Sequence, residues 1–428
     1  MPLLRLSLAA AILALLATAS QAETVLHNIE GYTSSADGPV EFSVLVVGDD
    51  GRVAATGDDA LLAAHTDAVL IDGGGRTVLP GLVDAHAHVL GYGLLQSQLD
   101  LTGVGSVGDA ADRIADYARD HVHARWILGR GWNQVLWPVK VFPRAADIDA
   151  VVSDRPVWLR RVDGHAGWAN SAAMKLAGID RDTADPVGGK IIRDAEGRAT
   201  GVFIDKAMGL INAHVPQPDK SEMRSAIRAA QDALLSQGIT GVHDAGIGLM
   251  TAEVYMSMAD DDDLDLRIYA MTAGAGDVLD ALGAPIRGYA DDHLAIAAVK
   301  LYTDGALGSR GAAMIEPYSD DPENRGLPFW TQSELDAMVA KANGMGFQVG
   351  IHAIGDLGNR MALEAFAKAQ DGKPSPLRNR IEHAQIVALG DIPRFAELGL
   401  VASMQATHAT SDKNMAEDRV WPERIRGG

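Results

Sequence analysis

The sequence contains no cysteine. This absence excludes disulfide bonds, thiol catalysis and thiolate metal ligands. Any metal ion must therefore be held by histidine, by carboxylate or by a modified lysine. Positive charge is also scarce, because 37 Lys and Arg residues stand against 57 Asp and Glu residues and give a formal net charge of -20. Such a surface repels phosphate, so we expect no nucleic acid and no anionic membrane as a partner.

A comfortable membrane span needs about 20 apolar residues, and the apolar run near the N-terminus is shorter than that. Arg5 precedes this run, which covers residues 6–19, and a small-x-small pattern ends at Ala22. The combination predicts a signal peptide at residues 1–22 and an exported, periplasmic protein with no stable membrane insertion after cleavage. An uncleaved anchor is the alternative.

The chain has 428 residues, 47% of them hydrophobic and 22% charged, which is typical of one large globular domain with a smaller one. Residues 23–79 contain short strands and turns, which predicts a small N-terminal β-sandwich module. From residue 221 onward strands alternate with helices, which indicates parallel βα units. We expect seven such strands, near residues 84, 242, 268, 299, 350, 382 and 402. The fold class is therefore α/β: residues 80–428 form a TIM-like (β/α)8 barrel that lacks its last strand.

A long insertion, at about residues 91–219, follows the first barrel strand and is expected to have irregular elements. Four of the seven tryptophans fall in two of its stretches, at residues 126–133 and 157–168. Aromatic rings so close together predict either a pocket wall or the packed core of an inserted subdomain. The candidate substrate contacts are Trp132, His165, Trp168 and, after the fourth strand, Arg310.

Two histidines, His86 and His88, are separated by one residue at the end of the first barrel strand. On a strand they face the same side, and neighbouring neutral imidazoles can bind a metal ion. Strands four, five and six carry Lys300, His352 and His383. In this barrel the carboxyl ends of the strands meet at one mouth, so the five side chains are expected to lie together and form a metal site.

Each of these residues also has a simpler interpretation. The two neighbouring histidines could lie in a loop by coincidence, and a single histidine is normally a hydrogen-bonded core residue. Lys300 could form a salt bridge with Asp304. Alternatively, a lysine buried between two metal ions could react with carbon dioxide and become a carbamate, which removes the cost of a buried ammonium. Further residues that could border the site are Asp84, Asp304, Asp356 and His408.

Taken together, these motifs resemble the metal-dependent amidohydrolase superfamily, and within it the YtcJ-like branch that includes N-substituted formamide deformylases. The resemblance runs from about residue 24 to the end of the chain. It is carried by PGLVDAHAH at residues 80–88, VKLYTDGALGSRGA at 299–312, IHAIGD at 351–356, RIEHAQ at 380–385, DGHA at 163–166 and WANS at 168–171.

The resemblance implies a hydrolase that cleaves a non-peptide carbon–nitrogen bond, of the amide or formamide type, with metal-activated water. His86 and His88 would bind one zinc ion, and His352 and His383 would bind a second. Lys300, in carboxylated form, would bridge the two ions. The partner would be a small-molecule substrate, and whether the chain forms a homo-oligomer is left open.

The chain departs from the family pattern at its C-terminus. In the family an aspartate at the end of the eighth strand transfers the proton to the leaving nitrogen, whereas this sequence stops at Gly428 after the seventh strand. We therefore expect a fragment whose catalytic aspartate lies beyond Gly428 and whose β module lacks its C-terminal strands. Two alternatives remain: a catalytically inactive truncated relic, and a periplasmic binding protein for a small ligand.

Overall fold

The computed structural model describes residues 23–162, 164, 166–186, 189–308, 310–413, 415–420, 424 and 426. The predicted signal peptide and the candidate His165 lie outside the described residues, so both stay predictions. The chain divides after Leu82 into two compact units, and each is described by itself. In the described ranges, no helix has both the length and the apolar character needed to cross a bilayer.

The N-terminal unit contains a five-stranded sheet. Its strands run in the order β2-β1-β3-β4, and β5 pairs in parallel with β1. Val25, Val44 and Val46 form its small buried core. The sandwich arrangement of this module stays a prediction. The strands are β1 (Thr24–Ser35), β2 (Gly38–Phe42), β3 (Val44–Val47), β4 (Val53–Gly57) and β5 (Val69–Val78).

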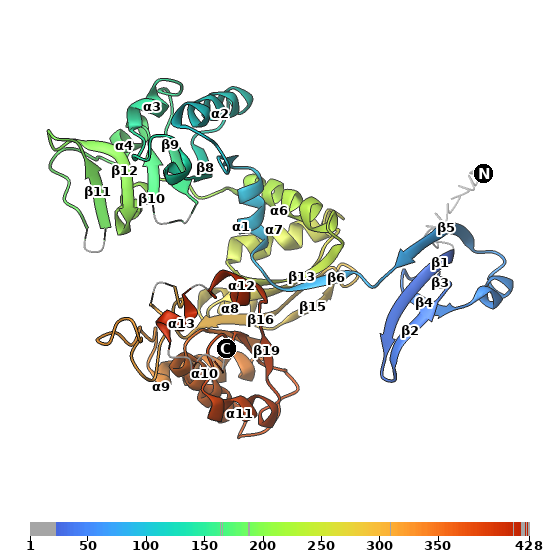
Figure 1. Cartoon of the computed structure of the whole chain (residues 1–428). Coiled ribbons are helices and arrows are strands. Elements are labelled where there is room, and N and C mark those ends of the chain that lie inside the picture. The colour runs from blue at the N-terminus through green and yellow to red at the C-terminus, as the bar shows by residue number, and fades with distance from the viewer. Residues whose placement is uncertain are drawn as a thin grey trace, which may run out of the picture. The chain divides into compact units, whose positions relative to one another are not determined.

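Seven strands of the second unit form a nearly closed barrel sheet (Figure 1). They pair in the order in which they follow along the chain, as expected for βα units. One short strand, β15 (Ile286–Tyr289), adds to β16 in antiparallel orientation. The seven predicted strands are confirmed, and they are β6 (Leu82–Ala87), β13 (Ile239–Ile247), β14 (Arg267–Ala273), β16 (Leu294–Tyr302), β17 (Gln348–Ala353), β18 (Arg380–His383) and β19 (Val401–Ser403).

Helices pack against this sheet and bury its apolar side chains. In the largest core, Val349 and Ile351 of β17 lie with Val339 of α9 and Phe366 of α10. A capping box opens α9, because Thr331 accepts a hydrogen bond from the backbone of Glu334, whose side chain accepts one in return from the backbone of Thr331. The helices of this unit outside the insertion are α1 (Val89–Gln96), α6 (Lys220–Leu235), α7 (Leu249–Asp260), α8 (Asp277–Leu282), α9 (Gln332–Gly344), α10 (Asp356–Ala369), α11 (Ile392–Glu397), α12 (Thr407–Ser411) and α13 (Ala416–Arg419).

The insertion between α1 and α6 is more regular than expected. It contains a six-stranded sheet in the order β11-β12-β10-β9-β8-β7. The strands have between two and seven residues, so each one alone gives a weak sequence signal. The elements are β7 (Leu99–Asp100), α2 (Val107–Asp120), β8 (Ile127–Trp132), α3 (Ala145–Asp149), β9 (Val157–Arg161), β10 (Ala166–Ala169), α4 (Ser171–Leu176), β11 (Gly189–Arg193), β12 (Ala199–Asp205) and α5 (Gly209–Asn212).

Candidate metal centre

Neighbouring parallel strands place the candidate ligands side by side. The register of β16 and β17 sets Tyr302 opposite His352, and that of β17 and β18 sets Ala353 opposite His383. His383 has a backbone φ of 73°, in the left-handed region that non-glycine residues rarely adopt. Such strain tends to occur at functional sites, and here it falls on the last residue of β18.

The five candidates converge in one cluster. The ring centroids of His86 and His88 are 5.4 Å apart, and His383 lies 4.7 Å from both His86 and His352. The amine nitrogen Nζ of Lys300 is 3.5 Å from Nε2 of His86. Lys300 is 1% exposed, so its amine lies inside the barrel. Residues separated by more than 290 positions in the sequence thus come into direct contact.

Burial lowers the pKa values of four basic groups in this cluster. It lowers the pKa of Lys300 from 10.5 to about 8. Burial, with the nearby charge of Lys300, lowers the pKa of His352 to about 4, and burial with the charge of His352 lowers that of His383 to about 3. The pKa of His88 is lowered too, by burial and then by His86 and Lys300. Neutral imidazole is the form that binds metal ions.

The chemistry of this donor set fits divalent metal ions. His86 and His383 each use Nδ1 for a hydrogen bond to an oxygen, of Glu382 and Gln405 respectively, which leaves the Nε2 lone pair for a metal ion. The described side chains do not form a ready-made group of three histidine or carboxylate ligands. One reason is that His352 turns its Nε2 toward the carbonyl oxygen of Gly305, at 3.4 Å.

Sequence reasoning assigned no role to two charged residues beneath the cluster. The carboxylate of Glu382 is fully buried and lies 2.6 Å from Nδ1 of His86. Arg380 forms an ion pair with Glu382. Burial alone would raise the pKa of Glu382, but the hydrogen bonds from His86 and Arg380 outweigh it and lower this pKa to about 2. Arg380 and Glu382 are two positions apart on β18, and alternate residues share one face of a strand. This spacing is the sequence signal that could have indicated them.

The four further candidates occupy different positions. Asp304 accepts hydrogen bonds from the backbone of Ala313, Ile354 and Gly355, and burial raises its pKa to about 6. Its oxygen Oδ1 also lies 3.7 Å from Nε2 of His352. His408, Asp84 and Asp356 are placed as follows: His408 stacks on His383 with centroids 5.3 Å apart, Asp84 accepts from the backbone of His86, and Asp356 binds Ile315 and Arg424.

Two of the candidate substrate contacts, Trp132 and Trp168, belong to the core of the insertion. Trp132 and Trp168 are fully buried in the insertion, and their rings meet edge to face at 6.1 Å. Each indole N–H donates to a backbone carbonyl, of Leu159 and Arg144 respectively. This arrangement is the packed core that was one of the two alternatives. Arg310 pairs with Asp320, at 2.8 Å, in the loop after β16.

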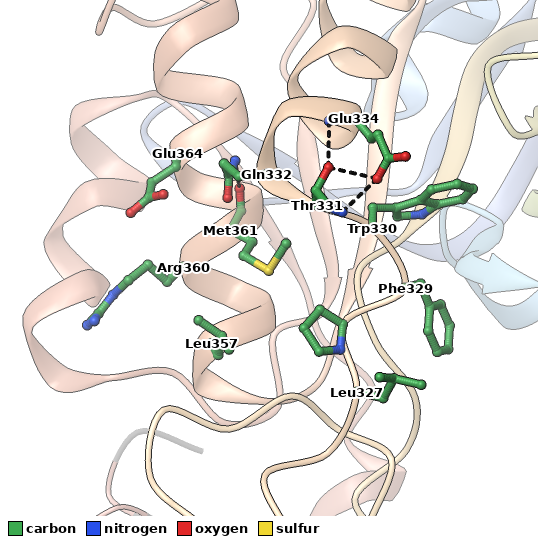
Figure 2. A pocket seen from close by; sticks show the side chains of 11 residues that line it. Leu327, Phe329, Trp330, Thr331, Gln332, Glu334, Leu357, Arg360, Met361 and Glu364 are labelled. Atoms are coloured by element: carbon green, nitrogen blue, oxygen red, sulfur yellow. Dashed lines mark hydrogen bonds between the residues drawn. The ribbon is translucent and has the colours of Figure 1, made fainter.

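A separate groove of about 700 Å³ lies beside α9 and α10 (Figure 2). Phe329 and Trp330 form one side of it, and Leu357, Arg360 and Met361 of α10 form the other. None of the described candidate ligands lines this groove. The histidine cluster is therefore the place in this unit where metal chemistry is to be sought.

Three curated relatives are similar to this chain over most of its length. "Putative amidohydrolase YtcJ" of Bacillus subtilis is 30% identical over 92% of this chain and 75% of its own length. "N-substituted formamide deformylase" of Arthrobacter pascens is 26% identical over 84% of this chain and 68% of its own length. "Protein LONG AFTER FAR-RED 3" of Arabidopsis thaliana is 35% identical over 82% of this chain, which spans only 62% of that protein.

The fold also matches a solved structure. An uncharacterized metal-dependent hydrolase from Pyrococcus furiosus aligns with a TM-score of 0.80 and 28% identity, over 95% of this chain and 81% of its own. The family model described as "Amidohydrolase family" matches residues 69–428, which include the whole histidine cluster. The resemblance read from the motifs is thus confirmed, and the chain belongs to the amidohydrolase family.

Proposed function

We propose that this chain is a metal-dependent hydrolase that cleaves an amide or formamide-like carbon–nitrogen bond outside ordinary peptides. The observation that carries the proposal is the position of Lys300, whose buried amine lies 3.5 Å from Nε2 of His86 within a cluster of imidazoles. Membership of the amidohydrolase family supports this reaction class, as do the names of the formamide deformylase and of the metal-dependent hydrolase.

In the proposed site, His86 and His88 would hold one divalent ion, and His352 and His383 would hold a second. Imidazole ligands suit zinc, which is our proposed metal. When bound, such ions polarise a substrate carbonyl and lower the pKa of a water molecule. The protein environment supplies neutral imidazoles, because burial lowers the pKa values of His88, His352 and His383.

Lys300 can join this site only after it loses its ammonium charge. Its neutral amine would add to carbon dioxide, forming one N–C bond as one C–O π bond opens and releasing one proton to solvent, and the product is a carbamate whose single negative charge is shared by two oxygens. Burial favours this step because it lowers the pKa of Lys300 to about 8. The ring of Tyr302, 4.9 Å from Nζ, covers one side of the amine.

A turnover assay tests the proposed function. We expect the chain to release formate or a carboxylate from at least one N-substituted formamide or small amide. The rate should fall by about 10³-fold or more after chelation, because the carbonyl loses several kcal/mol of stabilisation in the transition state. Added zinc should restore it, and unmodified dipeptides serve as the control that is not cleaved.

Two results would contradict this proposal. Turnover that persists unchanged in the metal-free chain would exclude a metal-dependent reaction. Ligand binding that survives chelation without any turnover would favour the periplasmic binding protein instead. Export itself, proposed from residues 1–22, is tested separately by locating the protein after expression of the full chain.

A further inference from the structure

Arg380 and Glu382 form a buried ion pair whose purpose the proposed function does not explain. Arg380 is 4% exposed and Glu382 is fully buried. The guanidinium binds both carboxylate oxygens, with Nε donating to Oε1 and Nη2 donating to Oε2 at 3.0 Å. Gly350 of β17 lies against this carboxylate, since a Cβ there would come within 2.8 Å of Oε1. The carboxylate is therefore held in one position.

Arg380 is itself fixed by three other strands. Its Nη2 donates to the carbonyl oxygen of Ala85 on β6 at 2.6 Å and to Oγ of Ser403 on β19 at 2.8 Å. Its Nη1 lies 2.6 Å from Nδ1 of His243 on β13. A guanidinium only donates hydrogen bonds, so His243 accepts through Nδ1. Such a network leaves Glu382 little freedom to rotate.

The fixed carboxylate sets the orientation of His86. A carboxylate without a proton only accepts, so Nδ1 of His86 carries the hydrogen in the 2.6 Å contact with Oε2. The lone pair is then on Nε2, the atom that lies 3.5 Å from Nζ of Lys300. A carboxylate in this position also makes the imidazole a stronger metal ligand.

His383, a candidate ligand of the second ion, is held by a weaker partner. Its Nδ1 lies against Oε1 of Gln405, a neutral amide oxygen. Hydrogen bonds to a charged acceptor are roughly twice as strong as those between neutral groups. The two proposed metal positions therefore differ in the group behind one of their histidines: an arginine-held carboxylate at one and an amide at the other.

From this asymmetry, and resting on the proposed function, we infer that Glu382 is a positioning residue, held by Arg380, that makes the His86–His88 position the tighter of two metal positions. Glu382 acts through His86 and does not itself touch the ion. The chain thus loads its first divalent ion at β6 and its second at β17 and β18.

The test compares zinc affinities of three metal-free chains by titration against a competing chelator. The wild-type chain should bind two ions with unequal affinities. In Glu382→Gln, which keeps the side-chain shape and removes the charge, the tighter affinity should fall by about 10–100-fold, the range seen when partners behind metal ligands are removed. The matched variant Gln405→Met should weaken only the second ion.

The outcomes separate this inference from the proposed function. A folded wild-type chain that binds no zinc would overturn the proposed function. If Glu382→Gln is folded and binds zinc as tightly as the wild-type chain does, only the inference is overturned. Near-ultraviolet circular dichroism shows whether each variant is folded.

If Glu382→Gln fails to fold, a proton NMR spectrum of the metal-free wild-type chain decides the inference. The short contact with Glu382 should give an exchange-protected, strongly downfield imidazole N–H signal that is lost in His86→Ala. Absence of this signal from the wild-type spectrum would overturn the inference, because His86 would then lack the proposed orientation.

Discussion

Replacement of Lys300 by methionine is expected to abolish turnover and, at the same time, to stabilise the metal-free chain. Lys300 is 1% exposed, and burial lowers its pKa from 10.5 to about 8. Methionine has a similar length and no ammonium group, so it fills the same space without the cost of removing a charge from water. The loss of turnover, by about 10³-fold or more, follows from loss of the proposed bridging ligand.

The pH dependence of this stabilisation follows from the direction of the pKa change. Between pH 8 and 10.5 the unfolded chain binds more protons at Lys300 than the folded chain does, so the free energy of unfolding of the wild type rises with pH. Below pH 8 Lys300 is charged in both states, so the full cost of burying its ammonium group remains. The difference between pKa values of 10.5 and about 8 corresponds to about 3 kcal/mol. The free energy of unfolding of Lys300→Met should therefore exceed that of the wild type by this amount at pH 7, and the excess should disappear near pH 10.5.

Denaturant unfolding of the metal-free chains at pH 7, 9 and 10.5 measures this effect. Lys368→Met is the matched control, because the Lys368 side chain is 71% exposed and its pairing with Asp336 is worth little. If Lys300→Met is less stable than the wild type by the same amount at every pH, burial of Lys300 does not lower the free energy of unfolding and the prediction is wrong.

Arg380→Met is expected to lower the free energy of unfolding by about 3–5 kcal/mol, because it leaves the carboxylate of Glu382 buried without its cation. The substitution also removes the hydrogen bonds that Arg380 makes to Ala85 on β6 and to Ser403 on β19. These are the two end strands of the seven-stranded order, so Arg380 ties together the strands on either side of the remaining opening in the barrel.

The double variant Arg380→Met, Glu382→Leu isolates the charge effect in this prediction. Replacing a whole buried ion pair by apolar residues is often close to neutral, whereas removing one partner is not. The double variant should therefore be more stable than Arg380→Met alone, in unfolding experiments at neutral pH. If both variants lose the same stability, the loss comes from packing and from the backbone contacts, not from an unpaired carboxylate.

The barrel could be predicted from the sequence because its strands are buried and apolar. In β16, for example, residues 296–299 are fully buried. Continuous apolar runs that alternate with helices are typical of parallel strands covered on both faces. The insertion was harder, since β7, β9, β10 and β11 have two to five residues each. The packing of Trp132 against Trp168 joins segments 36 positions apart, which no local pattern shows.

The candidate ligands could be predicted because strand ends share one mouth of the barrel. His86, Lys300, His352 and His383 need only the strand positions to be brought together. The role of Glu382 was hidden, since its contact with His86 spans 296 residues and depends on the side-chain angles of both partners. The alternation of Arg380 and Glu382 along β18 marked both as facing one side of the strand but gave no partner.

Metal content of the purified chain, measured by elemental analysis beside His86→Ala, tests the central claim most directly. The account predicts about two divalent ions per wild-type chain, with the first, tighter ion lost from His86→Ala and the fold retained. A folded wild-type chain without bound metal, after exposure to zinc, would contradict the metal site built from His86, His88, Lys300, His352 and His383.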